Sequence, residues 1–113
     1  MSLYYIDGGG GKGRGGGNPT VVTDADNTNL EVAGGTAYKF TSPLSVLKIK
    51  SVATSDKESI IYFTTDSSSI SFTDDSNVRW GGGNYKPSLE LNTVYCIAIR
   101  NGLAEIDNFG TVS

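Results

Sequence analysis

The sequence contains no histidine and only one cysteine, Cys96, among its 113 residues. It therefore lacks the side chain that most often moves protons at neutral pH and most often binds zinc. A single cysteine excludes a disulfide within the chain and a metal cage built from thiolates. The missing histidine also excludes nucleophilic catalysis by a Ser-His-Asp group.

The chain has no excess of positive charge and no long apolar run. Nine Lys and Arg residues stand against 12 Asp and Glu residues, which gives a net charge of −3 and an isoelectric point near 4.7. An acidic chain has no overall basic field to attract nucleic acid or an anionic membrane surface. No apolar stretch approaches the roughly 20 residues that a membrane-spanning helix needs. We therefore expect no nucleic-acid partner and no membrane insertion.

Good helix formers are also scarce. The chain has one methionine, four glutamates and no glutamine, whereas glycine alone contributes 15 residues and serine, threonine and asparagine are abundant. This composition favours short strands joined by polar turns over a helix bundle. At about 100–200 residues per domain, the length fits a single folded domain.

The first 19 residues differ from the rest of the chain. Residues 8–17 contain eight glycines in ten positions, and Pro19 closes the segment. One interpretation is a flexible linker, and the other is an extended glycine-rich segment packed closely in an oligomer. A phosphate-binding loop is excluded, because Ile6 stands where a glycine is required before Lys12, and Gly13 follows where Ser or Thr is required.

From residue 20 onward, β-prone runs and turn clusters alternate regularly. Around nine short strands at intervals of about 8–12 residues predict an all-β domain, a small antiparallel β-sandwich or jelly roll, over residues 20–113. Asn101-Gly102 joins two alternating runs and predicts a hairpin with a type I′ turn. The predicted core consists of Phe40, Leu47, Ile49, Ile61, Phe63, Ile70, Phe72, Trp80, Leu89, Leu91, Tyr95, Ile97, Ile99 and Ile106.

The carboxylates and the thiol give weak signals for chemistry. Asp24, Asp26 and Thr28 have the spacing that begins a calcium loop, but Asn29 replaces the required glycine, so only a looser surface calcium site stays open. We expect no metal and no cofactor. Cys96 lies between inward-facing neighbours, so it faces the opposite side of its strand, as a packed small residue or at a subunit interface.

Aromatic side chains offer a different kind of site. Trp80 followed by glycines 81–83 is either part of a platform for stacking sugars or a buried anchor for a loop. Tyr85 and its neighbour Asn84 lie within that loop and are better candidates for an exposed contact.

Residues 59–102 resemble a C-terminal β module found in tail, baseplate and head-fibre proteins of bacteriophages and prophages. That module has a Phe-Thr-Thr strand, a Val-Lys-Trp strand, a Pro-x-Leu-Glu-x-Asn turn and a Tyr-x-Ile-x-Ile hairpin, in that order. Here residues 63–65, 78–80, 87–92 and 95–99 match these motifs, with arginine in place of the lysine. The turn after residue 80 is longer in this chain, and the resemblance carries no catalytic residue.

The resemblance implies a non-enzymatic protein of the virion surface, located on a phage or prophage particle and otherwise extracellular. It implies a homo-oligomer, with a trimer favoured, that contacts other virion proteins and either decorates the particle or touches the host surface. Such a module binds a cell-surface glycan through exposed loops or serves only as a fibre tip. The residues predicted to contact such a ligand are Tyr85, Asn84, Trp80 and Asp66. The alternative function is a secreted bacterial carbohydrate-binding module appended to a larger enzyme.

Overall fold

The computed structural model describes residues 20–81 and 86–112, and this part of the chain forms nine β-strands and no helix. The all-β class predicted from composition is confirmed. The predicted glycine-rich leader, residues 1–19, lies outside the described residues. Within the described ranges no helix has the length and apolar character needed to cross a bilayer. The strands are β1 (Thr20–Thr23), β2 (Leu30–Val32), β3 (Thr36–Lys39), β4 (Val46–Val52), β5 (Ser59–Thr64), β6 (Ser71–Asp74), β7 (Arg79–Trp80), β8 (Thr93–Arg100) and β9 (Leu103–Thr111).

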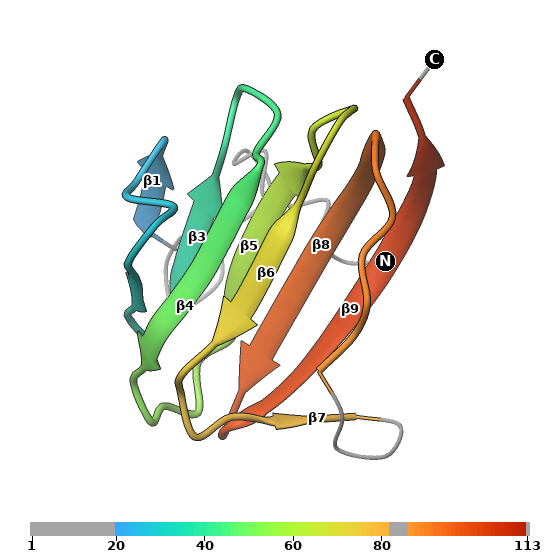
Figure 1. Ribbon diagram of the computed structural model, residues 1–113. Helices are drawn as coiled ribbons and strands as arrows, with labels where there is room; N and C mark the ends of the chain where they lie inside the picture. Colours follow the sequence, from blue (N-terminus) through green and yellow to red (C-terminus); the bar gives the residue numbers. More distant parts are fainter. Residues whose placement is uncertain (1–19, 82–85, 113) are drawn as a thin grey trace.

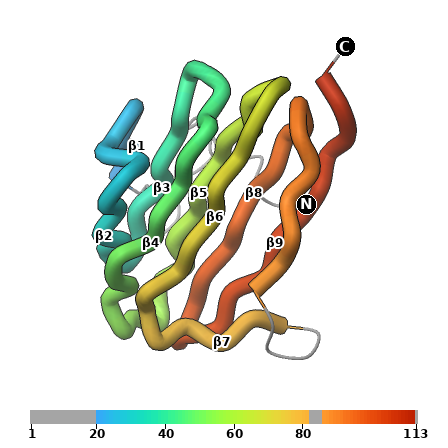
Figure 2. The backbone as a smooth tube through the Cα atoms, viewed as in Figure 1, coloured from blue at the N-terminus to red at the C-terminus, as the bar shows by residue number. Residues whose placement is uncertain are grey.

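The strands form two layers, which lie at the front and at the back in Figures 1 and 2. One layer is a six-stranded sheet in the order β1-β3-β5-β8-β9-β7, and the other is a three-stranded sheet in the order β2-β4-β6. From β1 to β6 the chain crosses from one sheet to the other after every strand. Each turn of this winding brings the chain back beside its previous strand in the same direction, as in a β-solenoid.

The predicted antiparallel arrangement is therefore wrong for most of the strand pairs. β1 pairs with β3, β3 with β5, β2 with β4, β4 with β6 and β7 with β9, and all these pairs are parallel. Parallel neighbours need a connection of about a dozen residues or more. In the winding, a strand of the opposite sheet and its two turns supply that connection. The two layers are confirmed, but their topology is a solenoid-like winding and not a jelly roll.

Antiparallel pairing is confined to the C-terminal part. β8 pairs antiparallel with β5 on one side and with β9 on the other. The predicted hairpin at Asn101-Gly102 is confirmed, with φ angles of 53° and 75° at these two residues. Both angles lie in the left-handed region, which glycine and asparagine adopt more readily than other residues.

The core lies between the two sheets and follows from strict alternation along the strands. In β5, Ile61 and Phe63 point inward, and in β4, Leu47 and Ile49 do the same. Nine of the predicted core residues are buried, and Phe72, Leu89 and Ile106 pack against the core while half-buried. Five further core members were not predicted: Leu30, Val32, Tyr38, Leu44 and Ala104.

Leu91 is the clear exception among the predicted core residues. Its side chain is 42% exposed. It belongs to the turn that enters β8, just before Asn92 with its positive φ of 56°, and not to a strand of its own. A turn does not keep the two-residue alternation that made Leu91 look buried. Ile70 is half-buried in the segment before β6.

Buried polar groups are paired throughout the described residues. Thr65 donates from Oγ1 to the carbonyl of Glu90 at 2.6 Å and accepts from the amide of Thr93 at 3.0 Å. Ser59 donates to the carbonyl of Ala33 at 2.6 Å. Among these residues no buried side-chain nitrogen or oxygen is without a partner. These bonds stabilise the irregular connections where they meet the core.

We predict that Leu47→Ala lowers the free energy of unfolding by about 2–5 kcal/mol, because it removes a fully buried side chain from a packed core. The matched control is Leu91→Ala at the exposed turn position, which we expect to change stability by no more than about 0.5 kcal/mol. Urea denaturation followed by circular dichroism measures both. Equal losses in the two variants would contradict the assignment of the core.

Candidate functional site

Trp80 ends β7 and lies in the core, with 5% of its surface exposed. Its indole Nε1 donates to Oδ2 of Asp74 at 2.9 Å. Its ring meets the ring of Phe72 edge-on, with centroids 5.9 Å apart and planes at 80°. Of the two predicted alternatives, Trp80 is therefore the buried anchor. The indole ring is not an open surface on which a sugar could stack.

The residues around Trp80 form a compact polar and aromatic cluster. Lys86 donates from Nζ to the carbonyl of Phe72 at 2.7 Å and lies 5.7 Å from the centre of the Phe72 ring. This distance allows an attraction between the ammonium charge and the aromatic face. The amide of Gly81 donates to the carbonyl of Ala104 at 2.9 Å. Gly81 and Lys86, which flank residues 82–85 in sequence, are thus both fixed to the sheets.

Two of the predicted contact residues, Asn84 and Tyr85, lie outside the described residues. Their predicted role in ligand contact stays a prediction. The structure shows only that the chain on either side of them is bonded to the body of the domain.

The fourth predicted contact residue, Asp66, lies at the opposite end of the six-stranded sheet. Thr65 bonds to Thr93 at the start of β8, whereas Trp80 pairs with Ala104, which lies opposite Ile99 near the end of β8. At about 3.3 Å per residue along β8, the two ends are about 20 Å apart. In Figure 1 the β5–β6 connection lies at the top and β7 at the bottom. The structure therefore does not bring Asp66 and Trp80 together in one site.

Asp66 serves its own turn. Its Oδ2 accepts from the hydroxyl of Ser68 at 2.7 Å and from the amide of Ser68 at 3.0 Å. These two bonds, the side-chain bond first, hold the pKa of Asp66 below its usual range. A carboxylate that is bonded in this way stabilises the turn more when it is ionised than when it is protonated.

Asp24 and Asp26, the start of the suspected calcium loop, also have separate partners. Asp24 accepts from the hydroxyl of Thr41 at 2.6 Å and from its amide at 2.8 Å, whereas Asp26 accepts from the hydroxyl and amide of Thr28. In both cases the side-chain bond is the larger cause of a lowered pKa. Within the described ranges no three Asp, Glu, Cys or His side chains group as metal ligands.

Cys96 is a buried thiol on the outward side of β8. Burial raises its pKa to about 12, and the negative charges of Asp107 and Glu58 act in the same direction. A thiol in this environment carries almost no thiolate at neutral pH and is a poor nucleophile. The interpretation of Cys96 as a packed small residue is confirmed.

The residues that the sequence reasoning missed are the ones that hold Trp80 in place. Asp74 accepts from the indole and also from the hydroxyl and amide of Ser76. The signal was present as a repeated Asp-x-Ser/Thr pattern at residues 26–28, 66–68 and 74–76. Aspartate followed two residues later by Ser or Thr is typical of a turn in which the carboxylate accepts from that residue.

Comparisons with known proteins identify no family. No protein-family model matches the chain, and no curated protein and no solved structure matches it either. The chemistry open to this chain is therefore inferred from the geometry of its polar side chains. In the described part, the carboxylates of Asp24, Asp26, Asp66 and Asp74 bind main-chain and hydroxyl groups of turns, and the thiol is buried.

We predict that lowering the pH from about 5 to 3 lowers the melting temperature, because Asp24, Asp26 and Asp66 have folded-state pKa values below their ordinary value of 3.8. A depressed pKa contributes stability above the unfolded value, and this is lost as the pH falls through the folded value. The triple variant Asp24→Asn, Asp26→Asn, Asp66→Asn keeps an acceptor oxygen in each turn and removes the titration. Its melting temperature, measured by circular dichroism, should fall less over this range. The triple variant Asp56→Asn, Glu90→Gln, Glu105→Gln, at exposed positions, is the control for three lost charges. An equally steep fall in the triple variant would refute the prediction.

A second prediction concerns the support of Trp80. Asp74→Ala removes the acceptor for the indole and for Ser76, and we expect a loss of about 1–3 kcal/mol in unfolding free energy. The adjacent control, Asp75→Ala, removes only an exposed ion pair with Lys48 at 3.4 Å, which typically contributes about 0–1 kcal/mol. Fluorescence of the single tryptophan in denaturant titrations measures both variants. A larger loss for Asp75→Ala would show that the indole bond is unimportant.

Proposed function

We propose that this chain is a non-enzymatic structural module of a phage-type virion fibre, held as a homotrimer at the particle surface. Two lines of reasoning support the proposal. The first is the resemblance of residues 59–102 to the fibre and tail module. The second is the geometry of the winding, whose first turn presents an edge strand of each sheet for association with other chains.

The observation that carries the proposal is the start of the winding. Among the described residues, β1 ends the six-stranded sheet and β2 ends the three-stranded sheet, so both sheets begin on the same turn of the winding with an edge strand. The outward side chain of Val21 in β1 is 47% exposed. Edge strands offer unpaired main-chain groups to a further strand, and natural proteins rarely leave them unprotected. Association with other chains of a fibre would cover these edges.

The adhesive part of the proposal concerns the end of the domain near Trp80. There the predicted contact residues Asn84 and Tyr85 follow a segment that is anchored by the indole and by Gly81. Contact with a host-surface glycan through these two residues is a sequence-based prediction, and Trp80 would support them from the core.

We predict that the protein in solution has a mass near three times 11.9 kDa, measured by light scattering after size-exclusion chromatography. Val21→Lys should shift the mass toward the monomer, because a charged side chain on an edge strand opposes pairing. Ser51→Lys, on the exposed side of the central strand β4, is the matched control and should leave the mass unchanged.

A monomer at micromolar concentration would overturn the fibre proposal. If that monomer bound sugars with millimolar affinity and lost this affinity in Tyr85→Ala, the alternative of an appended carbohydrate-binding module would replace it. Turnover of a glycan or an ester by the purified protein would overturn both.

A further inference from the structure

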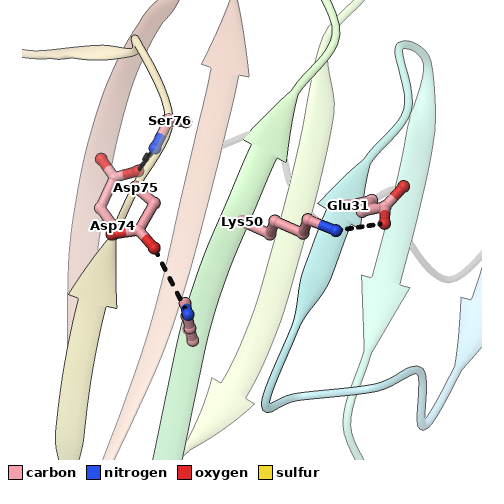
Figure 3. A network of polar contacts seen from close by, with 6 residues as sticks. Glu31, Lys50, Asp74, Asp75 and Ser76 are labelled. Atoms are coloured by element: carbon pink, nitrogen blue, oxygen red, sulfur yellow. Dashed lines mark hydrogen bonds and ion pairs between the residues drawn. The ribbon is translucent and has the colours of Figure 1, made fainter.

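The outward faces of the two sheets differ in chemistry. In β4, Lys48 and Lys50 alternate with core residues and point away from them. Lys50 lies 3.5 Å from a carboxylate oxygen of Glu31 in β2, and Lys48 lies 3.4 Å from one of Asp75. Figure 3 shows these contacts spread across the strands of the three-stranded sheet. This face is charged, as expected for a surface in water.

The outward face of the six-stranded sheet is apolar at its centre. Ala37 of β3, Ile60 of β5 and Cys96 of β8 form a cluster separate from the core, with Tyr62 packed against it. These four residues, which we call the outer patch, lie on adjacent strands, because Ala37 pairs with Ile60 and Tyr62 with Cys96. They alternate with core residues such as Ile61 and Ile97, so they face away from the second sheet.

The outer patch is excluded from water to an unexpected degree. Ala37, Ile60 and Cys96 are 1%, 7% and 2% exposed. Neither of the two sheets in the described part of the chain lies over them, since the three-stranded sheet packs on the opposite face. The outward side of a residue on an uncovered sheet face stays in contact with water. Exclusion of all three side chains therefore requires a cover.

We propose that the glycine-rich residues 8–17 of the same chain cover the outer patch. The inference goes beyond the proposed function and does not rest on it. Residue 8 lies 12 positions before Thr20, which starts β1 at the edge of this same sheet. At about 3.3 Å per residue the intervening chain can reach about 40 Å. The patch extends no more than about 15 Å from β1, that is, three strand spacings, so the reach is sufficient.

Side-chain size and charge both favour this occupant. Glycine has no side chain, and the patch presents the small side chains of Ala37 and Cys96, so a glycine-rich main chain can approach closely. The charged side chains within residues 8–17 are Lys12 and Arg14, both positive, and the negative charge of Asp7 precedes them. The carboxylates whose charges act on Cys96 are those of Asp107 and Glu58. The carboxylates lie beside the outer patch, and the positive side chains lie among the glycines, so the two surfaces have opposite charge.

Cys96 makes the proposal testable by disulfide trapping in the full chain. Cysteines placed one at a time at the eight glycine positions of residues 8–17 should, at one or more positions, form a disulfide with Cys96 on mild oxidation. The product should migrate as a monomer on a non-reducing gel. In the control, Cys96→Ala with Thr73→Cys moves the reporter thiol to the exposed side of β6, and no disulfide should form. Disulfide-linked dimers would assign the cover to a second copy, and no disulfide at any position would refute the proposal.

A second measurement uses the reactivity of the native thiol. In the full chain Cys96 should react slowly with a thiol-specific reagent at neutral pH, at a rate independent of protein concentration. Removal of residues 1–17 should speed the reaction about tenfold or more, because each unit by which the pKa falls gives about ten times more thiolate. Circular dichroism confirms that the shortened chain keeps its strands. Unchanged protection in a folded shortened chain would overturn the proposal, and the trapping experiment decides the matter if that chain does not fold.

Discussion

The pairing of β5 with its two neighbours is the constraint on which the rest of the structure depends. On one side β5 continues the parallel winding through β3, and on the other it pairs antiparallel with β8. Its inward residues Ile61 and Phe63 are fully buried, and Phe63 stacks on Tyr95 with ring centroids 5.8 Å apart. Burial of apolar area is the dominant favourable term in folding. The strand that joins the two kinds of pairing thus also contributes two fully buried side chains to the core.

Local chemistry made most of the strands predictable, but not their partners. Alternation of apolar and polar residues located β4 and β8, a continuous β-prone run located β5, and Asn101-Gly102 specified the hairpin. Each of these signals is contained in a few consecutive residues. Pairing between turns of the winding depends on residues far apart. Thr20 pairs with Thr36, 16 residues later, whereas Ala37 pairs with Ile60, 23 residues later. Unequal turns of this kind leave no regular repeat in the sequence.

The candidate site was predictable only in part, for a similar reason. The pattern of apolar residues placed Trp80 in the predicted core, and its burial is confirmed. The prediction that Asp66 and Trp80 contact the same ligand failed. Successive connections between strands lie at opposite ends of the domain, and the residues of a connection do not indicate at which end it lies. The aspartates of the Asp-x-Ser/Thr turns stood out in the sequence as possible ligands. Their carboxylates instead accept hydrogen bonds from the Ser or Thr of the same turn.

We expect the same division between local and distant pairing to set the order of folding. The β8–β9 hairpin closes over two residues, and such hairpins form in about 1–10 μs. Every parallel pair must first close a much longer loop, and the larger entropic cost of that closure slows the pairing. Synthesis on the ribosome releases β1, β2 and β3 first, yet the strand pair that assembles most readily is the last to emerge. We therefore expect β5 to gain its antiparallel neighbour β8 only after nearly the whole chain has been made, so that one edge of β5 stays unpaired until then.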